Sequence, residues 1–268
     1  KEEVLSFEEL ERFVGILAPM GIRKLRLTGG EPLLRRDLPR LISLLKKIRG
    51  IDDIALTTNA MLLTEQAESL AASGLDRVNI SLDSLLKERF EQITRRDALD
   101  RVLRGIEKAA AVFAGPLKIN AVLMRGLNDG EIPAFTELAR EQGHTIRFIE
   151  YMPLDADESW SRSSLVTGAE VRERMDLHLG GDTRLIEDPA RDPRAPAEDY
   201  VFSDGAPGKI GFINSVSEPF CENCNRIRIT ADGKLRTCLF SQEETDIASL
   251  LREGASDEKI AAAVRAAV

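Results

Sequence analysis

The chain has 268 residues, 43% of them hydrophobic and 31% charged, a length that suits one large domain or one domain with an appendage. The hydrophobic share excludes a disordered chain, and no apolar run approaches the roughly 20 residues of a membrane helix. The net charge of −8 argues against a general nucleic-acid binder, and the N-terminus shows no signal-peptide pattern. We therefore expect a cytoplasmic protein with neither nucleic acid nor a membrane as its partner.

The first half of the chain alternates predicted helices and strands. Ser6 and Glu9 form a capping box, after which apolar residues recur at helical spacing. Strands are predicted at 24–28, 54–57, 77–82, 117–123 and 145–149, with helices at 38–48 and 64–72 and a long helical stretch to Phe113. This alternation predicts βαβ units and a parallel sheet, hence an α/β fold. Because the chain opens with a helix, a complete barrel would need at least one strand before Lys1.

Several predicted strands have one polar face. In 77–82 the apolar residues alternate with Asn79 and Ser81, and in 117–123 they alternate with Lys118 and Asn120. A period of two places these polar side chains on one side of the sheet. Some of them could be edge positions open to water. The alternative interpretation is a barrel lumen that binds a polar, anionic ligand.

The second half has a different character. A helix begins at a second capping box, Thr167 with Glu170, and the proline-containing stretch 187–199 predicts a surface loop. Two short strands at 199–203 and 209–213, a cysteine-bearing loop, a strand-turn-strand around 231–233 and two closing helices follow. The sequence thus predicts two regions, residues 1–153 and 154–268.

All three cysteines of the chain, Cys221, Cys224 and Cys238, lie close together in the sequence. Structural zinc normally takes four Cys or His ligands, but His144 and His178 are remote and more typical of a loop residue and a helix C-terminal cation. Three cysteines without a fourth ligand fit an iron–sulfur cluster with one open iron. Zinc with a carboxylate or unseen fourth ligand, a disulfide, and buried free thiols remain alternatives.

Two further motifs carry polar groups suited to a ligand. Arg226 and Arg228 are two residues apart, so they share one side of an extended segment, and guanidinium groups bind phosphates and base edges in a bidentate manner. The turn at 28–32, Thr-Gly-Gly-Glu-Pro, follows a predicted strand and exposes backbone groups and the carboxylate of Glu31. Two surface arginines and an ordinary strand-to-helix turn are the plainer interpretations.

Together these motifs resemble the GTP 3′,8-cyclase family of molybdenum cofactor biosynthesis (molybdenum cofactor biosynthesis protein A), in the radical S-adenosylmethionine (SAM) superfamily. The resemblance covers essentially the whole chain. The matching segments, in chain order, are Arg26 with Thr-Gly-Gly-Glu-Pro at 28–32, Arg-Arg-Asp at 35–37, Leu-Thr-Thr-Asn at 56–59, Asn-Ile-Ser-Leu-Asp at 79–83, Ile-Arg-Phe-Ile-Glu-Tyr-Met at 146–152, and Phe220 with Cys221, Cys224, Arg226 and Arg228.

The resemblance implies an incomplete TIM-type (β/α) barrel in residues 1–153 and a C-terminal region, 154–268, with an auxiliary 4Fe–4S cluster and the GTP site. By position, the residues expected to contact SAM are Gly30, Glu31, Ser81 and Met152. Those expected to contact GTP are Arg26, Thr57, Lys118, Arg226 and Arg228, and we add Arg147 because it lies near a strand end. The expected ligands of the 4Fe–4S cluster are Cys221, Cys224 and Cys238.

The implied activity is that of a lyase: a SAM-dependent radical rearrangement of GTP to (8S)-3′,8-cyclo-7,8-dihydroguanosine 5′-triphosphate. SAM and GTP are the implied ligands, a cyclic pyranopterin monophosphate synthase acts downstream in the pathway, and a homodimer is one state that we consider. The family's C-x3-C-x2-C loop, its preceding strand and its C-terminal Gly-Gly tail are missing from these 268 residues. We therefore expect a chain truncated at both ends, inactive by itself, with a second 4Fe–4S cluster only in the full-length protein.

Two other functions stay open. The first is a catalytically inactive GTP-binding module that keeps only the auxiliary cluster; a C-x3-C-x2-C motif encoded before Lys1 would argue for the enzyme. The second is a radical SAM enzyme that modifies peptides with the help of an auxiliary cluster. The Arg226 and Arg228 pair disfavours this second alternative.

Overall fold

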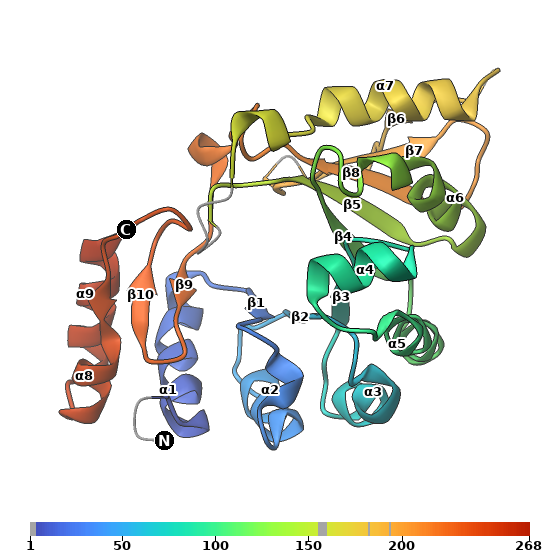
Figure 1. Cartoon of the computed structure of the whole chain (residues 1–268). Coiled ribbons are helices and arrows are strands. Elements are labelled where there is room, and N and C mark those ends of the chain that lie inside the picture. Colours follow the sequence, from blue (N-terminus) through green and yellow to red (C-terminus); the bar gives the residue numbers. More distant parts are fainter. Residues whose placement is uncertain (1–3, 155–159, 182, 193) are drawn as a thin grey trace. The chain divides into compact units, whose positions relative to one another are not determined.

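The computed structural model describes residues 4–154, 160–181, 183–192 and 194–268, and the chain forms two compact units (Figure 1). The first unit comprises residues 1–57, 66–77 and 225–268, and the second comprises residues 58–65 and 78–224. The division predicted at residue 153 refers to regions of the sequence rather than to these units, and it stays a prediction.

The first unit is built from helices around short strands. Its elements are α1 (Phe7–Leu17), η1 (Ala18–Met20), β1 (Lys24–Leu27), η2 (Pro32–Leu34), α2 (Leu38–Lys46), most of β2 (Asp53–Thr58) and of α3 (Leu63–Ala72), β9 (Arg228–Ile229), β10 (Lys234–Arg236), β11 (Thr245–Asp246), α8 (Ile247–Arg252) and α9 (Asp257–Ala267). Strands β1 and β2 pair in parallel, whereas β9, β10 and β11 form a small antiparallel sheet.

Residues from both ends of the chain share one hydrophobic core in the first unit. Phe13 and Leu17 of α1 pack with Ile247 and Leu251 of α8 and with Ile260 of α9. These side chains are at most 7% exposed. Burial of such side chains stabilises a fold by about 1.5–3 kcal/mol each, so this core anchors β9 and β10 beside the N-terminal helix.

The second unit holds most of the parallel sheet. Its elements are β3 (Arg77–Ser81), α4 (Lys87–Thr94), α5 (Leu99–Val112), β4 (Lys118–Leu123), η3 (Asp129–Glu131), α6 (Ile132–Gln142), β5 (Thr145–Glu150), η4 (Arg162–Ser164), α7 (Gly168–Leu179), β6 (Leu185–Glu187), β7 (Glu198–Phe202), β8 (Lys209–Ile213) and η5 (Cys221–Asn223). The strand order within this unit is β3-β4-β5-β8-β7-β6. β3, β4, β5 and β8 are parallel, and β7 and β6 continue the sheet in antiparallel fashion.

The predicted strands and capping boxes are confirmed, with two differences elsewhere. Ser6 caps α1 and Thr167 caps α7 through reciprocal bonds with the glutamate three residues on. The long helical stretch to Phe113 is wrong as one element: it is two helices, α4 and α5, separated by Arg95 in the left-handed region at φ 59°. The short strands β6 and β11 were not predicted, because their few residues carry no readable period.

The parallel strands of the second unit have two different faces. In β4, Ile119 and Ala121 are fully buried, whereas Lys118 and Asn120 are half-buried. In β5, Phe148 contacts the ring of Phe135 from α6 edge to face, with the ring centroids 6.0 Å apart. The apolar face therefore packs on the helices, and the other face carries the polar side chains.

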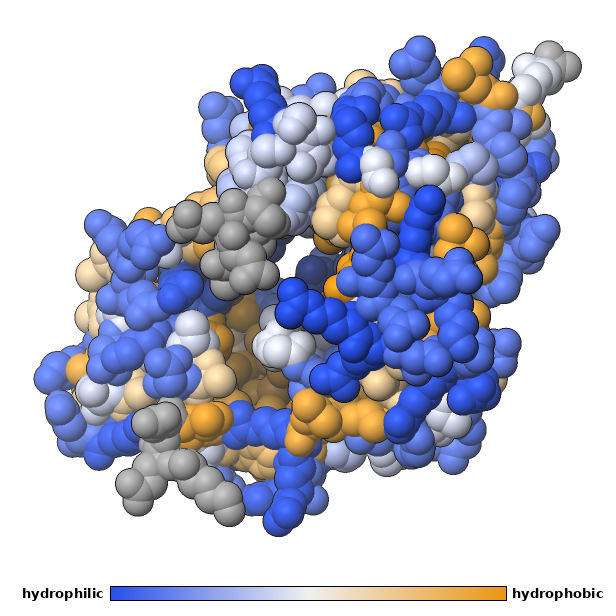
Figure 2. Space-filling view, viewed as in Figure 1, coloured by the Kyte–Doolittle hydropathy of each residue, from blue (hydrophilic) through white to orange (hydrophobic). Residues whose placement is uncertain are grey.

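Hydrophilic residues dominate the face of the molecule drawn in Figure 2, with hydrophobic residues scattered among them. No helix within the described residues is both long and apolar enough to cross a membrane.

Candidate active site on the polar face of the parallel strands

Five residues of the second unit lie in register across its sheet. Ser81 on β3 pairs with Asn120 on β4, Asn120 with Arg147 on β5, Arg147 with Gly211 on β8, and Gly211 with Asp199 on β7. We call these five residues the polar row. Because paired residues of neighbouring strands point to the same face of a sheet, the polar row brings Ser81 and Arg147, two predicted ligand contacts, onto one surface.

Arg147 is held by an ion pair within this row. Its Nη2 lies 2.9 Å from Oδ2 and 3.3 Å from Oδ1 of Asp199, and the arginine is only 7% exposed. A Cβ atom on Gly211 would lie 2.5 Å from Asp199 Oδ1 and 2.9 Å from Arg147 Cγ. The missing side chain of Gly211 is therefore what allows Asp199 to reach Arg147 across β8.

The other predicted contacts of the second unit differ in exposure. Lys118 precedes Asn120 by two residues on the same face of β4 and is half-buried, whereas Ser81, at the end of β3, is exposed. Met152 follows β5 and is also half-buried. The polar face that the sequence predicted thus exists. Lys118 adds a cation to it, two residues before Asn120 of the polar row.

The loops that follow β3 and β4 are joined by two side chains that the sequence analysis did not single out. Asn128 donates to the carbonyl oxygens of Asp83 and Val122, at 2.7 and 2.8 Å, and accepts the N–H of Met124. Glu131 accepts the hydroxyl of Ser84 at 2.8 Å. Both residues are at most 4% exposed. A polar residue in a strand-to-helix loop was the only signal available, and it does not distinguish a buried bridge from a surface turn.

Asp83, which follows β3, is also hydrogen-bonded to β4. Its Oδ1 accepts the backbone N–H of Val122 at 2.8 Å. Burial raises the pKa of the Asp83 carboxyl above its ordinary value, and the hydrogen bond from Val122 opposes that rise. The loops after β3 and β4 are therefore fixed to each other directly beyond Ser81.

Glu150 fixes the loop after β8 in a similar way. This carboxylate ends β5, is 2% exposed, and accepts the backbone N–H groups of Val216 and Ser217 at 2.7 and 2.8 Å. It also accepts the hydroxyl of Ser217. The ends of β5 and β8 are thus tied together, and the chain continues from Ser217 toward the Cys221 turn.

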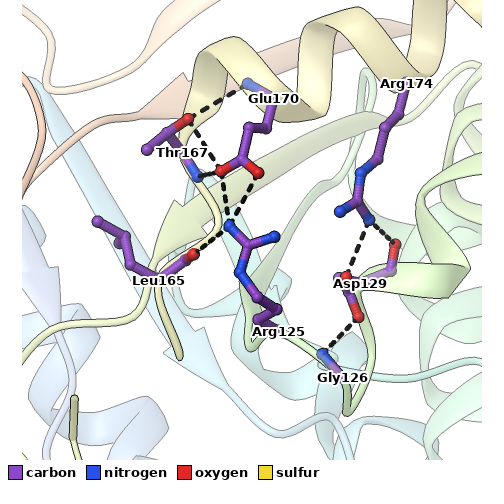
Figure 3. Close-up of polar contacts among 7 residues, drawn as sticks. All are labelled: Arg125, Gly126, Asp129, Leu165, Thr167, Glu170 and Arg174. Carbon is purple, nitrogen blue, oxygen red and sulfur yellow. Dashed lines mark hydrogen bonds and ion pairs between the residues drawn. The ribbon is translucent and has the colours of Figure 1, made fainter. Parts of the chain in front are cut away.

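Two ion pairs connect the loop after β4 to α7 (Figure 3). Arg125 Nη2 lies 2.8 Å from both carboxylate oxygens of Glu170, and Arg174 Nη1 lies 2.9 Å from Asp129 Oδ2. The hydrogen bond from Arg125, followed by that from the backbone of Thr167, lowers the pKa of Glu170. Glu170 and Arg174 are one turn apart, so a single face of α7 holds this loop.

A cavity of about 410 Å³ lies beside the Arg125 and Glu170 contact. Both residues line it, and so do Trp160, Arg162, Leu165, Thr167, Val216 and Ser217. Trp160 is oriented by a 2.8 Å hydrogen bond from its indole nitrogen to the carbonyl oxygen of Tyr151. The loops that follow β4, β5 and β8 therefore border one hollow, at the edge where parallel α/β sheets place their ligands.

In the first unit, the 28–32 turn begins directly after β1. Gly29 has φ 145°, a conformation that side chains rarely adopt, so the glycine is required by the backbone. Glu31 Oε1 accepts the N–H of Leu33 at 3.1 Å and caps η2. The carboxylate that the sequence analysis assigned to SAM thus also has a local structural role.

The residues predicted to contact GTP in the first unit differ in their exposure. Arg26 on β1 is exposed, and Thr57 on β2 is half-buried. Arg226 and Arg228 are both half-buried, at and just before β9. The Nη1 atom of Arg228 is buried and has no hydrogen-bond partner among the residues described. A buried guanidinium N–H without a partner is costly, and a bound anion would satisfy it.

Two regions of the chain match known protein families. Residues 1–139 match the radical SAM superfamily, and residues 144–268 match the family described as Molybdenum Cofactor Synthesis C. The GTP 3′,8-cyclase of Paenarthrobacter nicotinovorans is 47% identical over 97% of this chain and 76% of its own length. Those of Rhodopirellula baltica and Heliobacterium modesticaldum are 43% and 44% identical, over 71% and 80% of their lengths.

The chain belongs to the GTP 3′,8-cyclase family. It is therefore an enzyme of the radical SAM superfamily and of molybdenum cofactor biosynthesis. Membership of this superfamily implies SAM and a 4Fe–4S cluster.

The fold agrees with this family. Streptococcus suis SuiB, solved with bound S-adenosylmethionine, superposes with a TM-score of 0.66 at 16% identity, over 94% of this chain and 59% of SuiB. The hydrogenase maturase HydG of Carboxydothermus hydrogenoformans gives a TM-score of 0.51 over 65% of this chain. The predicted α/β fold, an incomplete TIM-type barrel of the radical SAM type, is thus confirmed.

The cysteines suit the cluster that a GTP 3′,8-cyclase family member requires. All three are exposed and none of them forms a disulfide among the residues described, contrary to the disulfide and buried-thiol alternatives. Cys221 and Cys224 belong to one 3₁₀ turn, η5, in which the N–H of Cys224 donates to the carbonyl oxygen of Cys221. Cys238 belongs to the first unit. The described residues contain no group of three Cys, His, Asp or Glu side chains placed to hold a metal ion, so the donor chemistry alone supports the fit.

Proposed function

We propose that this chain binds GTP and SAM and serves the radical rearrangement of GTP to (8S)-3′,8-cyclo-7,8-dihydroguanosine 5′-triphosphate. The observation that carries the proposal is the polar row, in which Ser81, Asn120 and Arg147 lie on neighbouring parallel strands of an acidic protein. Lys118 extends it with a second cation. Cations gathered on one face of a chain with a net charge of −8 suit an anionic ligand such as a triphosphate.

In this proposal the chain's own residues bind and orient the two ligands. Lys118 and Arg147, together with Arg26, Thr57, Arg226 and Arg228, contact GTP. The residues that contact SAM are Gly30, Glu31, Ser81 and Met152. Arginine is suited to phosphate because its planar donors match two phosphate oxygens, and Asp199 fixes the orientation of Arg147. The reactive chemistry would come from the bound groups: a 4Fe–4S cluster would supply the electron for the reductive cleavage of SAM, and SAM would supply the radical chemistry at the ribose.

We further propose that Cys221, Cys224 and Cys238 hold one 4Fe–4S cluster on the GTP side. Three exposed cysteines that form no disulfide among the described residues support this proposal, and they also suit a reducing, cytoplasmic location. The 268 residues contain no other cysteine that could hold a second cluster for SAM cleavage. In this proposal all three cysteines of the 268 residues serve the GTP-side cluster, so none of them is available to a cluster that cleaves SAM.

Two measurements on the anaerobically reconstituted chain test the proposed function. Calorimetry with GTP should show binding, and incubation with SAM and dithionite should release no 5′-deoxyadenosine. Absence of GTP binding would contradict the assignment of the polar row. Robust release of 5′-deoxyadenosine would contradict the proposal that the cluster held by the three cysteines serves GTP and not the cleavage of SAM.

A further inference from the structure

Asn120 belongs to the polar row, and its side-chain amide is available for hydrogen bonding. It is half-buried on β4, between Ser81 on β3 and Arg147 on β5. Within the part of the chain that the structure describes, its amide group makes no hydrogen bond, and neither of its polar atoms is a buried atom without a partner. Its donor and its acceptor are therefore open to the space above the sheet.

This position is unusual for a structural asparagine. Asparagine is disfavoured in strands, and the side chain of Asn120 makes no hydrogen bond to the described backbone that would give it a structural role. Asn128, in the same unit, shows the usual case: it is 0% exposed and its amide makes three hydrogen bonds to the backbone. The amide of Asn120, in contrast, remains available to a ligand on the polar face.

The neighbours of Asn120 restrict which chemical group of a ligand can face it. Ser81 beside it is the proposed SAM contact, and the cations Arg147 and Lys118 are the proposed contacts of GTP. Neighbouring parallel strands are about 4.8 Å apart, so one ligand group can face Asn120 and its neighbours at once. A phosphate or a carboxylate only accepts hydrogen bonds and is matched by the cations. A carboxamide donates and accepts, as a hydroxyl group does.

We infer that Asn120 hydrogen-bonds a ribose hydroxyl of the nucleotide and so distinguishes a ribonucleotide from a deoxynucleotide. The inference rests on the proposed function, because it takes GTP as the occupant of the polar row. Asn120 is then a specificity-determining residue: the ribose, which joins the triphosphate to the base, lies between the cations and the SAM contact.

The test compares three nucleotides on the anaerobically reconstituted chain. Calorimetry measures the affinity of GTP, 2′-deoxyGTP and 3′-deoxyGTP for the parent chain and for Asn120→Ala. The parent should bind GTP more tightly than one of the two deoxynucleotides by roughly three- to tenfold, the effect of one neutral hydrogen bond. In Asn120→Ala this preference should disappear, because GTP affinity falls while the affinity of that deoxynucleotide is unchanged.

Two further variants control the comparison. Asn120→Ser keeps a short donor and acceptor and should retain part of the preference, which provides a second reading if Asn120→Ala folds poorly. Gln142→Ala removes an exposed carboxamide at the end of α6 and should behave as the parent.

The outcomes separate this inference from the proposed function. A parent that binds none of the three nucleotides overturns both. A parent that binds GTP but does not prefer it over either deoxynucleotide overturns only the role of Asn120. The same holds if Asn120→Ala keeps the parent's full preference.

Discussion

Arg147 on β5 and Asp199 on β7 form an ion pair across the intervening strand β8, with Nη2 and Oδ2 2.9 Å apart. The pair spans two strands because the residue between them, Gly211, has no side chain. A buried arginine needs such a partner, since an unpaired charge in this position would cost several kcal/mol. Gly211 is therefore as important to the orientation of Arg147 as Asp199 is.

Gly211→Ala should destabilise the protein by about 1–3 kcal/mol, the usual cost of inserting a methyl group into a packed site. The new Cβ would lie 2.5 Å from Asp199 Oδ1, so the ion pair would have to separate. Urea denaturation followed by circular dichroism measures the effect. Gly130→Ala is the matched control in the same unit, because its Cβ would meet only the guanidinium of Arg89 at 3.7 Å. Equal stabilities of the two variants would show that the ion pair adapts.

The reconstituted chain should bind about four iron and four sulfide ions through Cys221, Cys224 and Cys238. The three thiols are exposed, and neither His144 nor His178 is near them in the sequence. Iron and sulfide analysis with Mössbauer spectroscopy gives the answer, and Cys238→Ser should lose most of the cluster. Tightly bound zinc without sulfide would show that the site is a zinc site instead.

Arg226→Ala or Arg228→Ala should weaken GTP binding roughly ten- to a hundredfold, because a charge-assisted hydrogen bond in a sheltered site is worth about 1.5–3 kcal/mol. The buried Nη1 of Arg228 has no hydrogen-bond partner among the residues described, and a bound phosphate would supply one. Lysine at either position should restore binding only in part, since an ammonium group lacks the planar fork of arginine.

The control for the arginine variants is their iron content. Arg226 follows Cys224 closely, so a change at this position could disturb the cluster rather than the nucleotide. Variants that keep the parent's iron and sulfide but lose GTP affinity support a direct contact. If both alanine variants bind GTP as the parent does, these arginines have no part in the site.

Acidification below about pH 6.5 should destabilise the protein through His144. This side chain is 6% exposed, and burial lowers its pKa below the ordinary value of 6.5. The unfolded chain therefore takes up a proton that the folded protein resists, and the free energy of unfolding decreases as the pH falls through 6.5.

Urea midpoints at pH 7.5 and 5.5 measure this effect of His144. His144→Gln should flatten the difference between the two values, whereas His178→Gln should leave it in place. If His144→Gln retains the full pH dependence, other groups cause it.

The sequence predicted the parts of the fold that depend on local pattern. The capping boxes at Ser6 and Thr167 and the alternating strands are signals within a few residues, and the structure follows them. The break between α4 and α5 could not be predicted, because Arg95 is an unusual residue for a left-handed conformation. Periodicity continues through this break and gives no warning of it.

The site was predictable as a face but not as a set of contacts. The alternation in β4 indicated a polar surface, and Lys118 and Asn120 do lie on it. Asp199 reaches Arg147 because strand β8 lies between β5 and β7 in the sheet. This strand order cannot be derived from the spacing of residues in the sequence. The bridges made by Asn128 and Glu131 are hidden for the same reason, since their partners come from another loop.

The anchoring of Ser217 by Glu150 limits how far the thiol of Cys221 can travel. Cys221 is only four residues after Ser217, so their Cα atoms can be at most about 14 Å apart when the segment is fully extended. A segment of this length keeps Cys221 close to the ends of β5 and β8, although its thiol is exposed to solvent. Lengthening this segment by a few glycines would release the Cys221 turn while leaving every strand of the sheet intact.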